Sequence, residues 1–203
     1  MSSKDLIRKL YHVAGGMIAP VLYVFIVDKT AILAISLVCT AIVFAFEYFR
    51  LKTPAFNDFV LDRVPVGLKS DERNRVAAHA YIVVAFFLVI LCTHRAVAIP
   101  AMAFLACGDP AGAIAGTAWG RHKIGRGPKS YEGSVACFLV SLLVGGVLAL
   151  CIGSSTAPAV PLWILAVGAA VATATEVWHW KLDDNFVIPV ASAAVMEILF
   201  RVA

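Results

Sequence analysis

The stretch AVAIPAMAFLACGDPAGAIAGTAW, residues 96–119, decides the fold class of this chain. It is long enough to cross a bilayer, because an α-helix needs about 20 predominantly apolar residues to do so. Yet it carries a carboxylate, Asp109, and a series of glycines in its second half, and the basic stretch GRHKIGRGPKSYEGS, residues 120–134, follows it. A carboxylate inside a membrane span is costly and usually marks a functional site.

The composition of the whole chain is that of an integral membrane protein. Of the 203 residues, 61% are hydrophobic and 15% are charged, and the mean hydropathy is +0.88. A soluble domain is closer to half apolar and a quarter charged. We therefore expect an all-α, polytopic membrane helical bundle with about seven transmembrane helices, folded as a single domain over residues 1–203. The predicted spans are 6–27, 30–48, 76–93, 96–119, 134–153, 159–181 and 186–202.

The distribution of lysine and arginine predicts the orientation of these spans. Basic residues concentrate on the cytoplasmic side of a membrane protein. With a cytoplasmic N-terminus, the inner segments are 1–9, 49–75, 120–133 and 181–185, and they hold 14 of the 17 basic residues. We therefore expect the N-terminus and these four segments to face the cytoplasm. Because topology explains the basic residues, the net charge of +4 does not indicate a nucleic-acid partner.

Asp109 and the glycines that follow it share one face of the predicted helix. Gly112, Gly116 and Gly120 lie 3, 7 and 11 residues after Asp109, and these offsets fall on one side of an α-helix. Small residues at this spacing often serve helix packing, although packing does not explain why the aspartate is in the same stripe. The Gly-Asp-Pro sequence resembles a helix N-cap followed by proline in the first turn, so we expect the span to kink or break at Asp109.

A second acidic face lies at the end of the sixth predicted span. Glu176, His179 and Asp183 are offset by 3 and 7 residues, and Asp184 and Asn185 follow directly. The predicted topology gathers this face, Asp109 and the basic loop at the cytoplasmic side. Phosphoryl groups need a divalent cation held by one or two carboxylates, with lysine or arginine neutralising the remaining charge. The residues alone therefore predict either a membrane enzyme that handles a nucleotide or pyrophosphate at the inner leaflet, or a transporter.

Two motifs of this chain resemble those of a known family. GDPAGAIAGTAWGRHKIG followed by KSYEGS is similar to the D-x-x-[AG]-x-x-x-G-x-x-x-G and K-[ST]-x-E-G-[ST] signature of the integral-membrane CTP-dependent lipid kinases. This family includes dolichol, phytol and farnesol kinases and the fungal CTP-type diacylglycerol kinase. FEYFRLKTPAFN with DERNR, and EVWHWKLDDNFVIP, also resemble family elements, so the resemblance covers about residues 8 to 190. Gly112 stands where many members have alanine.

The resemblance implies transfer of the γ-phosphoryl group of CTP, or of another nucleoside triphosphate, to the hydroxyl of a lipid alcohol, with Mg²⁺ as cofactor. An isoprenoid alcohol is favoured over diacylglycerol by analogy with the phytol and polyprenol branch. By this analogy Asp109 would hold Mg²⁺, with Glu132 or Asp184 as a second ligand, and Asp183 or Glu176 would be the base. The remaining predicted binding residues are Gly112, Gly116, Gly120, Arg121, Lys123, Lys129, Ser130, Gly133, Ser134 and Asn185. The implied location is the inner (cytoplasmic) membrane or its equivalent, with the site facing the cytoplasm.

Two alternatives stay open. The related phosphatidate cytidylyltransferases share the first half of the signature, but their terminal motif is replaced here by DDNFVIP, which favours phosphoryl over nucleotidyl transfer. A transporter would also carry carboxylates and broken helices within the membrane. It would have little use for a Lys-Ser-Tyr-Glu-Gly-Ser loop outside the spans. The oligomeric state is not indicated by the sequence.

Overall fold

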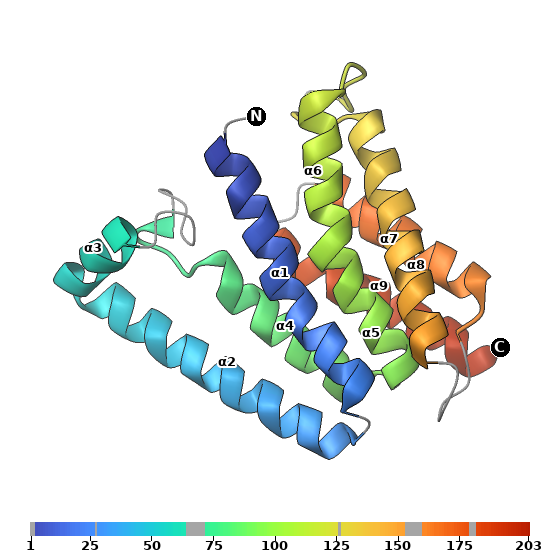
Figure 1. Cartoon of the computed structure of the whole chain (residues 1–203), viewed down its shortest axis with the longest axis horizontal. Helices are drawn as coiled ribbons and strands as arrows, with labels where there is room; N and C mark the ends of the chain where they lie inside the picture. Colours follow the sequence, from blue (N-terminus) through green and yellow to red (C-terminus); the bar gives the residue numbers. More distant parts are fainter. Residues whose placement is uncertain (1–2, 27, 64–71, 126, 153–159, 179–181) are drawn as a thin grey trace.

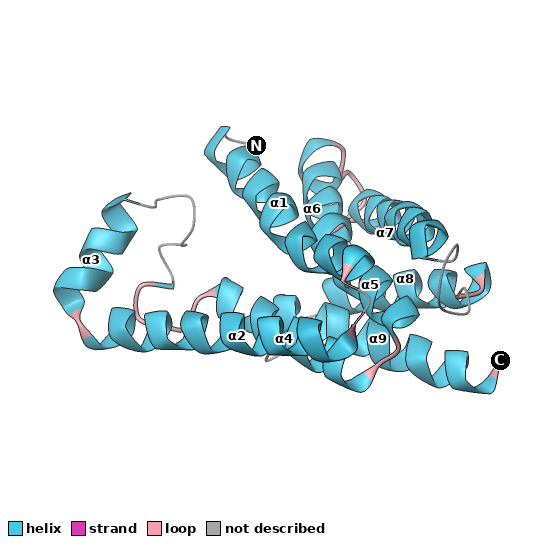
Figure 2. Ribbon diagram, turned by 60° about the horizontal axis from the view of Figure 1, so that its bottom comes forward, coloured by secondary structure: helices cyan, strands magenta, loops and turns pink. Residues whose placement is uncertain are grey.

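The computed structural model describes residues 3–26, 28–63, 72–125, 127–152, 160–178 and 182–203, and these residues form an all-helical bundle (Figures 1 and 2). The helices, in chain order, are α1 Ser3–Phe25, α2 Lys29–Lys52, α3 Pro54–Arg63, α4 Ala78–Cys92, α5 Arg95–Ala103, the π-helical turn Phe104–Gly108, α6 Asp109–Ala118, α7 Tyr131–Ile152, α8 Leu162–Val177 and α9 Asp184–Val202. The predicted all-α class is confirmed for the described residues.

A helix occupies each of the seven segments that the sequence predicts as spans. Four helical stretches are long and apolar enough to cross a membrane: α2, the continuous run from Arg95 to Ala118, α7 and α9. The helices α4 and α8 are apolar but have only 15 and 16 residues, and α1 begins with the charged residues Asp5, Arg8 and Lys9. Among the described residues, the structure therefore supports a membrane protein with four candidate membrane-spanning helices.

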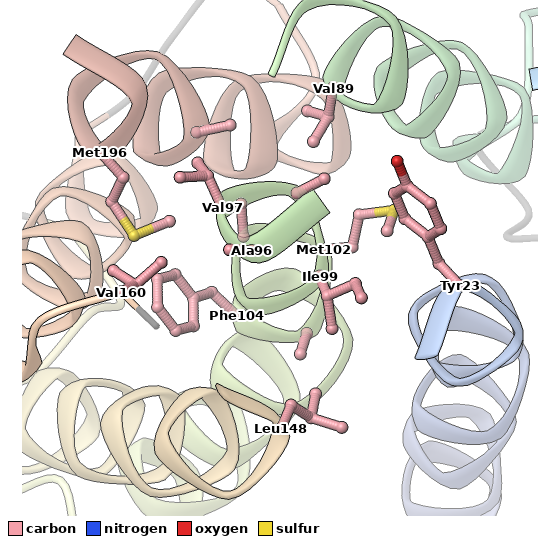
Figure 3. Close-up of a cluster of buried hydrophobic side chains, with 14 of the residues drawn as sticks. Tyr23, Val89, Ala96, Val97, Ile99, Met102, Phe104, Leu148, Val160 and Met196 are labelled. Atoms are coloured by element: carbon pink, nitrogen blue, oxygen red, sulfur yellow. The ribbon is translucent and has the colours of Figure 1, made fainter. Parts of the chain in front are cut away.

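Helix α5 forms the centre of the bundle. Every residue from Ala96 to Leu105 is buried, and these side chains pack against α1, α4, α7 and α9. Figure 3 shows the cluster, with Phe104 directed towards α7 and Met196 of α9 nearby. A Cβ atom at Gly145 of α7 would lie 2.5 Å from Cε1 of Phe104, so glycine at this position allows α7 to approach the ring closely.

The stretch from α5 to α6 is one helix with a π-helical turn in its middle. Asp109 and the preceding Gly108 both have right-handed helical backbone angles. The expectation that Asp109 is an N-cap at a helix break is therefore wrong. Proline has no amide hydrogen, and its ring clashes with the carbonyl four residues earlier, here that of Ala106. The wider π turn over Phe104–Gly108 accommodates Pro110 without ending the helix.

One end of the bundle is tied together by polar contacts that join consecutive helices. Arg95 donates to the carbonyl oxygens of Tyr23 and Val24 at the end of α1, at 2.9 and 2.6 Å. Glu197 of α9 accepts from the backbone amide of His94 at 2.9 Å, and Arg201 donates to it at 2.7 Å. These contacts fix the connections between α1, α4, α5 and α9 at the end opposite the candidate site.

Large apolar side chains cover the outer faces of the bundle. Leu10, Ile18 and Phe25 on α1 are exposed, as are Leu143 and Leu150 on α7. A monomeric soluble protein rarely presents contiguous apolar surface of this extent. This apolar outer surface is compatible with a lipid bilayer around the bundle.

Candidate functional site

The glycine stripe of α6 packs against the first turns of α7. A Cβ atom at Gly112 would lie 3.0 Å from Cβ of Cys137 and 3.1 Å from the carbonyl oxygen of Gly133. A Cβ atom at Gly133 would lie 2.8 Å from the carbonyl oxygen of Gly112. The two helices thus approach backbone to backbone, as small residues at four-residue spacing permit. Gly116 and Gly120 continue this contact towards Ser130, so the stripe serves helix packing.

The loop between α6 and α7 folds back on itself as a short hairpin. The amide of Ile124 donates to the carbonyl of Lys129 at 2.9 Å, and the amide of Tyr131 donates to the carbonyl of His122 at 3.0 Å. Gly125, with φ of 59°, lies in the turn, where a residue with a side chain would be strained. The hairpin brings Lys123 and Lys129 to the same side of the bundle as the glycine stripe.

Ser130 begins α7 as a capping residue. Its hydroxyl oxygen accepts from the amide of Gly133 at 3.2 Å, and its carbonyl oxygen accepts from the amide of Ser134 at 3.0 Å. Side-chain capping of this kind satisfies amides that a helix N-terminus leaves without partners. A phosphate group in this region would therefore meet the lysines and hydroxyl groups rather than the amides of Gly133 and Ser134.

Lys129 lies at the centre of the site. Its ammonium donates to Oε1 of Glu176, in the last turn of α8, and only 4% of the Glu176 side chain is exposed against 28% for Lys129. Burial by itself would lower the pKa of Lys129. The hydrogen bond to Glu176 and the charges of Glu176, Asp109 and Asp184 outweigh burial, so the pKa is raised above its ordinary value. Lys129 is thus a fixed cation among carboxylates from α6, α8 and α9.

Two cavities are lined by Lys129, and a third contains Asp109. The glycine cavity, of about 460 Å³, is lined by the α6 glycines, Lys123, Lys129, Ser130 and Glu176, with Gly133 and Ser134 of α7. The carboxylate cavity, of about 220 Å³, is lined by Lys129 and Glu176 together with Asp183 and Asp184. The α1–α4 cavity, of about 440 Å³, contains Asp109 and Asn185 with residues of α1 and α4. The Lys129–Glu176 pair lines both the glycine cavity and the carboxylate cavity.

Most of the site residues predicted from sequence lie at this end of the bundle, but they line different cavities. Asp109 lines the α1–α4 cavity, whereas the glycines that share its stripe line the glycine cavity. Asp183 is the N-cap of α9, and it accepts from the amide of Asn185 at 3.0 Å and from its side-chain amide at 2.7 Å. His179 lies outside the described residues.

Glu132 and Arg121 lie apart from the Lys129 cluster. The carboxylate of Glu132 contacts Nδ1 of His122 at 2.6 Å, and it also accepts from the His122 backbone amide at 3.2 Å. It thereby closes the base of the hairpin, and it lines none of the three cavities. Arg121 is exposed in the same loop and lines none of them either. This position favours a structural role for Glu132 over the predicted role of metal ligand.

A buried arginine that the sequence analysis did not identify organises the connection from α2 to α4. Arg50 is fully buried, and its guanidinium donates to both carboxylate oxygens of Glu47, at 2.8 and 2.7 Å. It also donates to Oδ1 of Asn57 at 2.9 Å and to the carbonyl oxygens of Glu72 and Arg75 at 3.1 and 2.7 Å. Glu47 accepts from the backbone amide of Ala77 at 2.9 Å and Glu72 from that of Ala78 at 3.0 Å, so Arg50 acts on the start of α4 through these two residues. The sequence signal was an arginine with Glu three positions earlier on one helical face.

Among the described residues, no group of three or more His, Cys, Asp or Glu side chains converges as a metal site. Mg²⁺, however, is usually held by one or two carboxylates with substrate phosphates completing its coordination. Asp109, in the α1–α4 cavity, and Asp184, in the carboxylate cavity, are each a carboxylate of this kind. No protein-family model, curated protein or solved structure matches the chain.

Proposed function

We propose that the chain is a membrane enzyme that transfers the γ-phosphoryl group of CTP, or of another nucleoside triphosphate, to the hydroxyl of a lipid alcohol. The observation that carries the proposal is the Lys129–Glu176 pair, which joins a glycine-lined cavity with two lysines to a cavity with two aspartates. Positioning and electrostatic stabilisation supply most of the catalysis in phosphoryl transfer, and this arrangement offers both. The favoured acceptor is an isoprenoid alcohol, by the family resemblance alone.

In this proposal the glycine cavity holds the triphosphate. Lys123 and Lys129 neutralise phosphate oxygens, and Ser134 lines the same cavity. Glu176 fixes the position of the Lys129 ammonium and keeps it charged. A preorganised ammonium stabilises the charge that develops on the transferred group without having to rearrange during the reaction.

The chemical step forms one bond and breaks another. The acceptor oxygen bonds to the γ-phosphorus, the bond from the γ-phosphorus to the β–γ bridging oxygen breaks, and the nucleoside diphosphate leaves. The hydroxyl proton passes to a carboxylate of the cluster, for which Asp183 and Glu176 are the proposed acceptors. Asp109 and Asp184 would hold Mg²⁺, which supplies charge stabilisation to the phosphates when bound.

The structure of the bundle centre favours an enzyme over a transporter. A transporter binds its substrate near the midplane and exposes that site to each side in turn. Here the centre of the bundle is filled by Val97, Met102 and Phe104, each with 0% exposure. The polar cavities lie at one end, where residues of α1, α4, α6, α8 and α9 meet. A further cavity, of about 450 Å³, lies at the opposite end and is lined mainly by apolar side chains of α4 and α9. Polar cavities at one end suit a reaction between a nucleotide and a membrane lipid.

The full topology is part of the proposal. Seven spans, with the N-terminus and the three cavities at the cytoplasmic side, would place the site where nucleotides are available. The distribution of basic residues supports this orientation. Lys69, Arg126 and Lys181, which contribute to that distribution, lie outside the described residues.

The test is phosphate transfer by purified protein in phosphatidylcholine nanodiscs with Mg²⁺. Isoprenoid alcohols, straight-chain alcohols and diacylglycerol are supplied separately with CTP or ATP. We expect a phosphorylated lipid from at least one isoprenoid alcohol. A panel in which diacylglycerol alone is phosphorylated would overturn the acceptor assignment, and no phosphorylated lipid from any acceptor would overturn the proposed activity.

A further inference from the structure

We infer that the α1–α4 cavity is the subsite for the lipid acceptor, which is a neutral long-chain alcohol whose hydroxyl lies beside Asp109 and whose chain runs between α1 and α4. The role of this alcohol as the phosphoryl acceptor rests on the proposed function. The binding site itself is argued from the shape, polarity and charge of the cavity. Its volume of about 440 Å³ is in the range of small-molecule sites and suits a head group with the first part of a chain.

The lining of this cavity changes from polar to apolar along both helices. On α1, Lys9 and His12 precede Gly15 and Gly16, and at about 1.5 Å per residue Gly16 lies about 10 Å along the helix from Lys9. On α4, His79 precedes Ile82 and Val83 in the same direction. A lipid has the same polarity, with a head group at the membrane surface and a chain directed into the bilayer. The cavity therefore matches an amphiphile in one orientation.

The space between α1 and α4 is open at the apolar end of the cavity. A Cβ atom built at Gly15 would have no atom within 4 Å, so the absence of a side chain there leaves free volume. Helix α1 packs on α5, α6 and the π-helical turn, whereas α4 packs on α2, α5 and α9. Figure 1 shows α1 and α2 diverging towards the end of the bundle that carries the N-terminus. The open space at Gly15 leaves room for a lipid chain between α1 and α4.

The charges around the polar end favour a neutral head group. Arg8 and Lys9 are balanced by Glu72 and Asp109, and Arg8 also forms an ion pair with Asp5 at 3.4 Å. A phosphate head group would find no surplus of positive charge here and would have to lie close to Asp109. A hydroxyl can donate to a carboxylate and accept from an ammonium, so it suits both Asp109 and Lys9. An alcohol therefore fits this cavity better than a phosphatidate.

The acceptor subsite lies next to the proposed nucleotide site without overlapping it. Asp109 lines the α1–α4 cavity, and its charge acts on Lys129, which lines the glycine cavity. Asn185, the second residue of α9, lines the α1–α4 cavity, while its neighbour Asp184 lines the carboxylate cavity. The acceptor hydroxyl beside Asp109 would thus face the carboxylate cavity, which holds the proposed bases, across the neighbouring residues Asp184 and Asn185.

The experiment measures lipid binding separately from catalysis. The full chain in phosphatidylcholine nanodiscs is irradiated with a hexadecanol that carries a diazirine near its hydroxyl end, and the labelled residues are mapped by mass spectrometry. Unlabelled hexadecanol, its methyl ether and phosphatidate are the competitors. Gly15→Leu should fill the apolar end of the cavity. Gly146→Leu is the matched control, because a Cβ atom at Gly146 of α7 also meets open space and Gly146 lines none of the cavities.

We expect labelling within residues 8–16 and 78–83 that hexadecanol suppresses and the methyl ether does not. Gly15→Leu should reduce this labelling at least about tenfold, Gly15→Ala should reduce it less, and Gly146→Leu should leave it unchanged. Three results would overturn the inference. The first is labelling at other residues only, and the second is equal labelling of the Gly15→Leu and Gly146→Leu proteins. The third is stronger suppression by phosphatidate than by hexadecanol. Specific labelling at these sites without any phosphate transfer would keep the subsite and refute the proposed function. Phosphate transfer that Gly15→Leu does not affect would support the proposed function and refute the subsite.

Discussion

Lys129 and Glu176 are 47 residues apart in the chain, and a hydrogen bond between their charged groups joins the α6–α7 hairpin to the last turn of α8. Charged pairs of this kind hold their side chains in one geometry when at least one partner is removed from water. Glu176 is almost fully buried, so the pair fixes the ammonium of Lys129 at the boundary of two cavities.

Replacing Lys129 should affect the nucleotide and not the lipid. Lys129→Ala removes a charge that interacts with the transferred group, so we expect a raised KM for nucleotide and a lowered kcat, with little change in the KM for the lipid alcohol. Lys129→Arg restores the charge but not the compact shape of an ammonium, and should recover part of the activity. Titration of nucleotide at saturating lipid measures these constants.

Two controls accompany this series. Lys52→Ala removes an exposed lysine from the end of α2 and should leave all constants unchanged. The thermal midpoint of Lys129→Ala in detergent separates loss of folding from loss of phosphate binding, because this variant leaves the buried Glu176 without its charged partner. Unaltered nucleotide constants in Lys129→Ala would show that Lys129 does not bind phosphate.

Replacing Asp109 by Asn should abolish most of the activity without unfolding the protein. The substitution keeps the shape of the side chain but removes its charge, and metal ions stabilise transition-state charge by several kcal/mol. We expect kcat/KM to fall by a factor of at least about one hundred. Asp62→Asn, at an exposed position on α3, makes the same chemical change outside the cavities and should be silent. Normal turnover by the Asp109→Asn protein, measured beside its thermal midpoint in detergent, would make Asp109 a structural residue.

The contact between α6 and α7 should be sensitive to a single methyl group. Gly133→Ala would place Cβ 2.8 Å from the carbonyl oxygen of Gly112, so the two helices would have to separate. Overpacking typically costs about 1–3 kcal/mol, and the thermal midpoint should fall accordingly. Gly146→Ala on the same helix meets open space and should leave the midpoint unchanged or slightly higher. Equal midpoints for the two variants would refute the close approach at Gly133.

The helices of this chain were predictable because apolar length is a strong signal. Each of the seven predicted segments contains a helix, and the boundaries of the fourth differ by one residue at each end, 96–119 against Arg95–Ala118. We expected a kink or a break at Asp109; the helix does not break there, but a π-helical turn ends at Gly108, directly before it. A capping pattern and a proline inside a continuous helix look alike in sequence, and the sequence carries no separate signal for the π-helical turn over Phe104–Gly108.

The site was predictable only as a set of residues at one end of the bundle. Lys129, Glu176 and the aspartates were identified because charged residues next to apolar spans are conspicuous. Their partners were not, because contacts such as Lys129–Glu176 and Glu132–His122 depend on how the hairpin folds. The sequence around Asp109 also does not predict that this residue lies outside the glycine cavity. This position follows from the α1 and α4 side chains that surround Asp109 in three dimensions.

The orientation of the bundle can be measured with introduced cysteines. In a background without the five native cysteines, Arg121→Cys and Leu182→Cys place thiols at two exposed positions near the site, and Arg201→Cys places one at the opposite end. An impermeant maleimide added to sealed, right-side-out vesicles should label only the Arg201→Cys protein. After permeabilisation all three should react. Labelling of Arg121→Cys or Leu182→Cys from the outside would contradict a cytoplasmic site.

The position of the transferred phosphorus tests the central claim most directly. Purified protein in nanodiscs is given Mg²⁺, an isoprenoid alcohol, and CTP labelled either at the γ-phosphate or at the α-phosphate. If the chain is a lipid-alcohol kinase, the lipid product carries the γ label and none of the α label, and Asp109→Asn reduces that product at least about a hundredfold. Appearance of the α label in lipid would show nucleotidyl transfer, and no labelled lipid above the Asp109→Asn level would contradict the account.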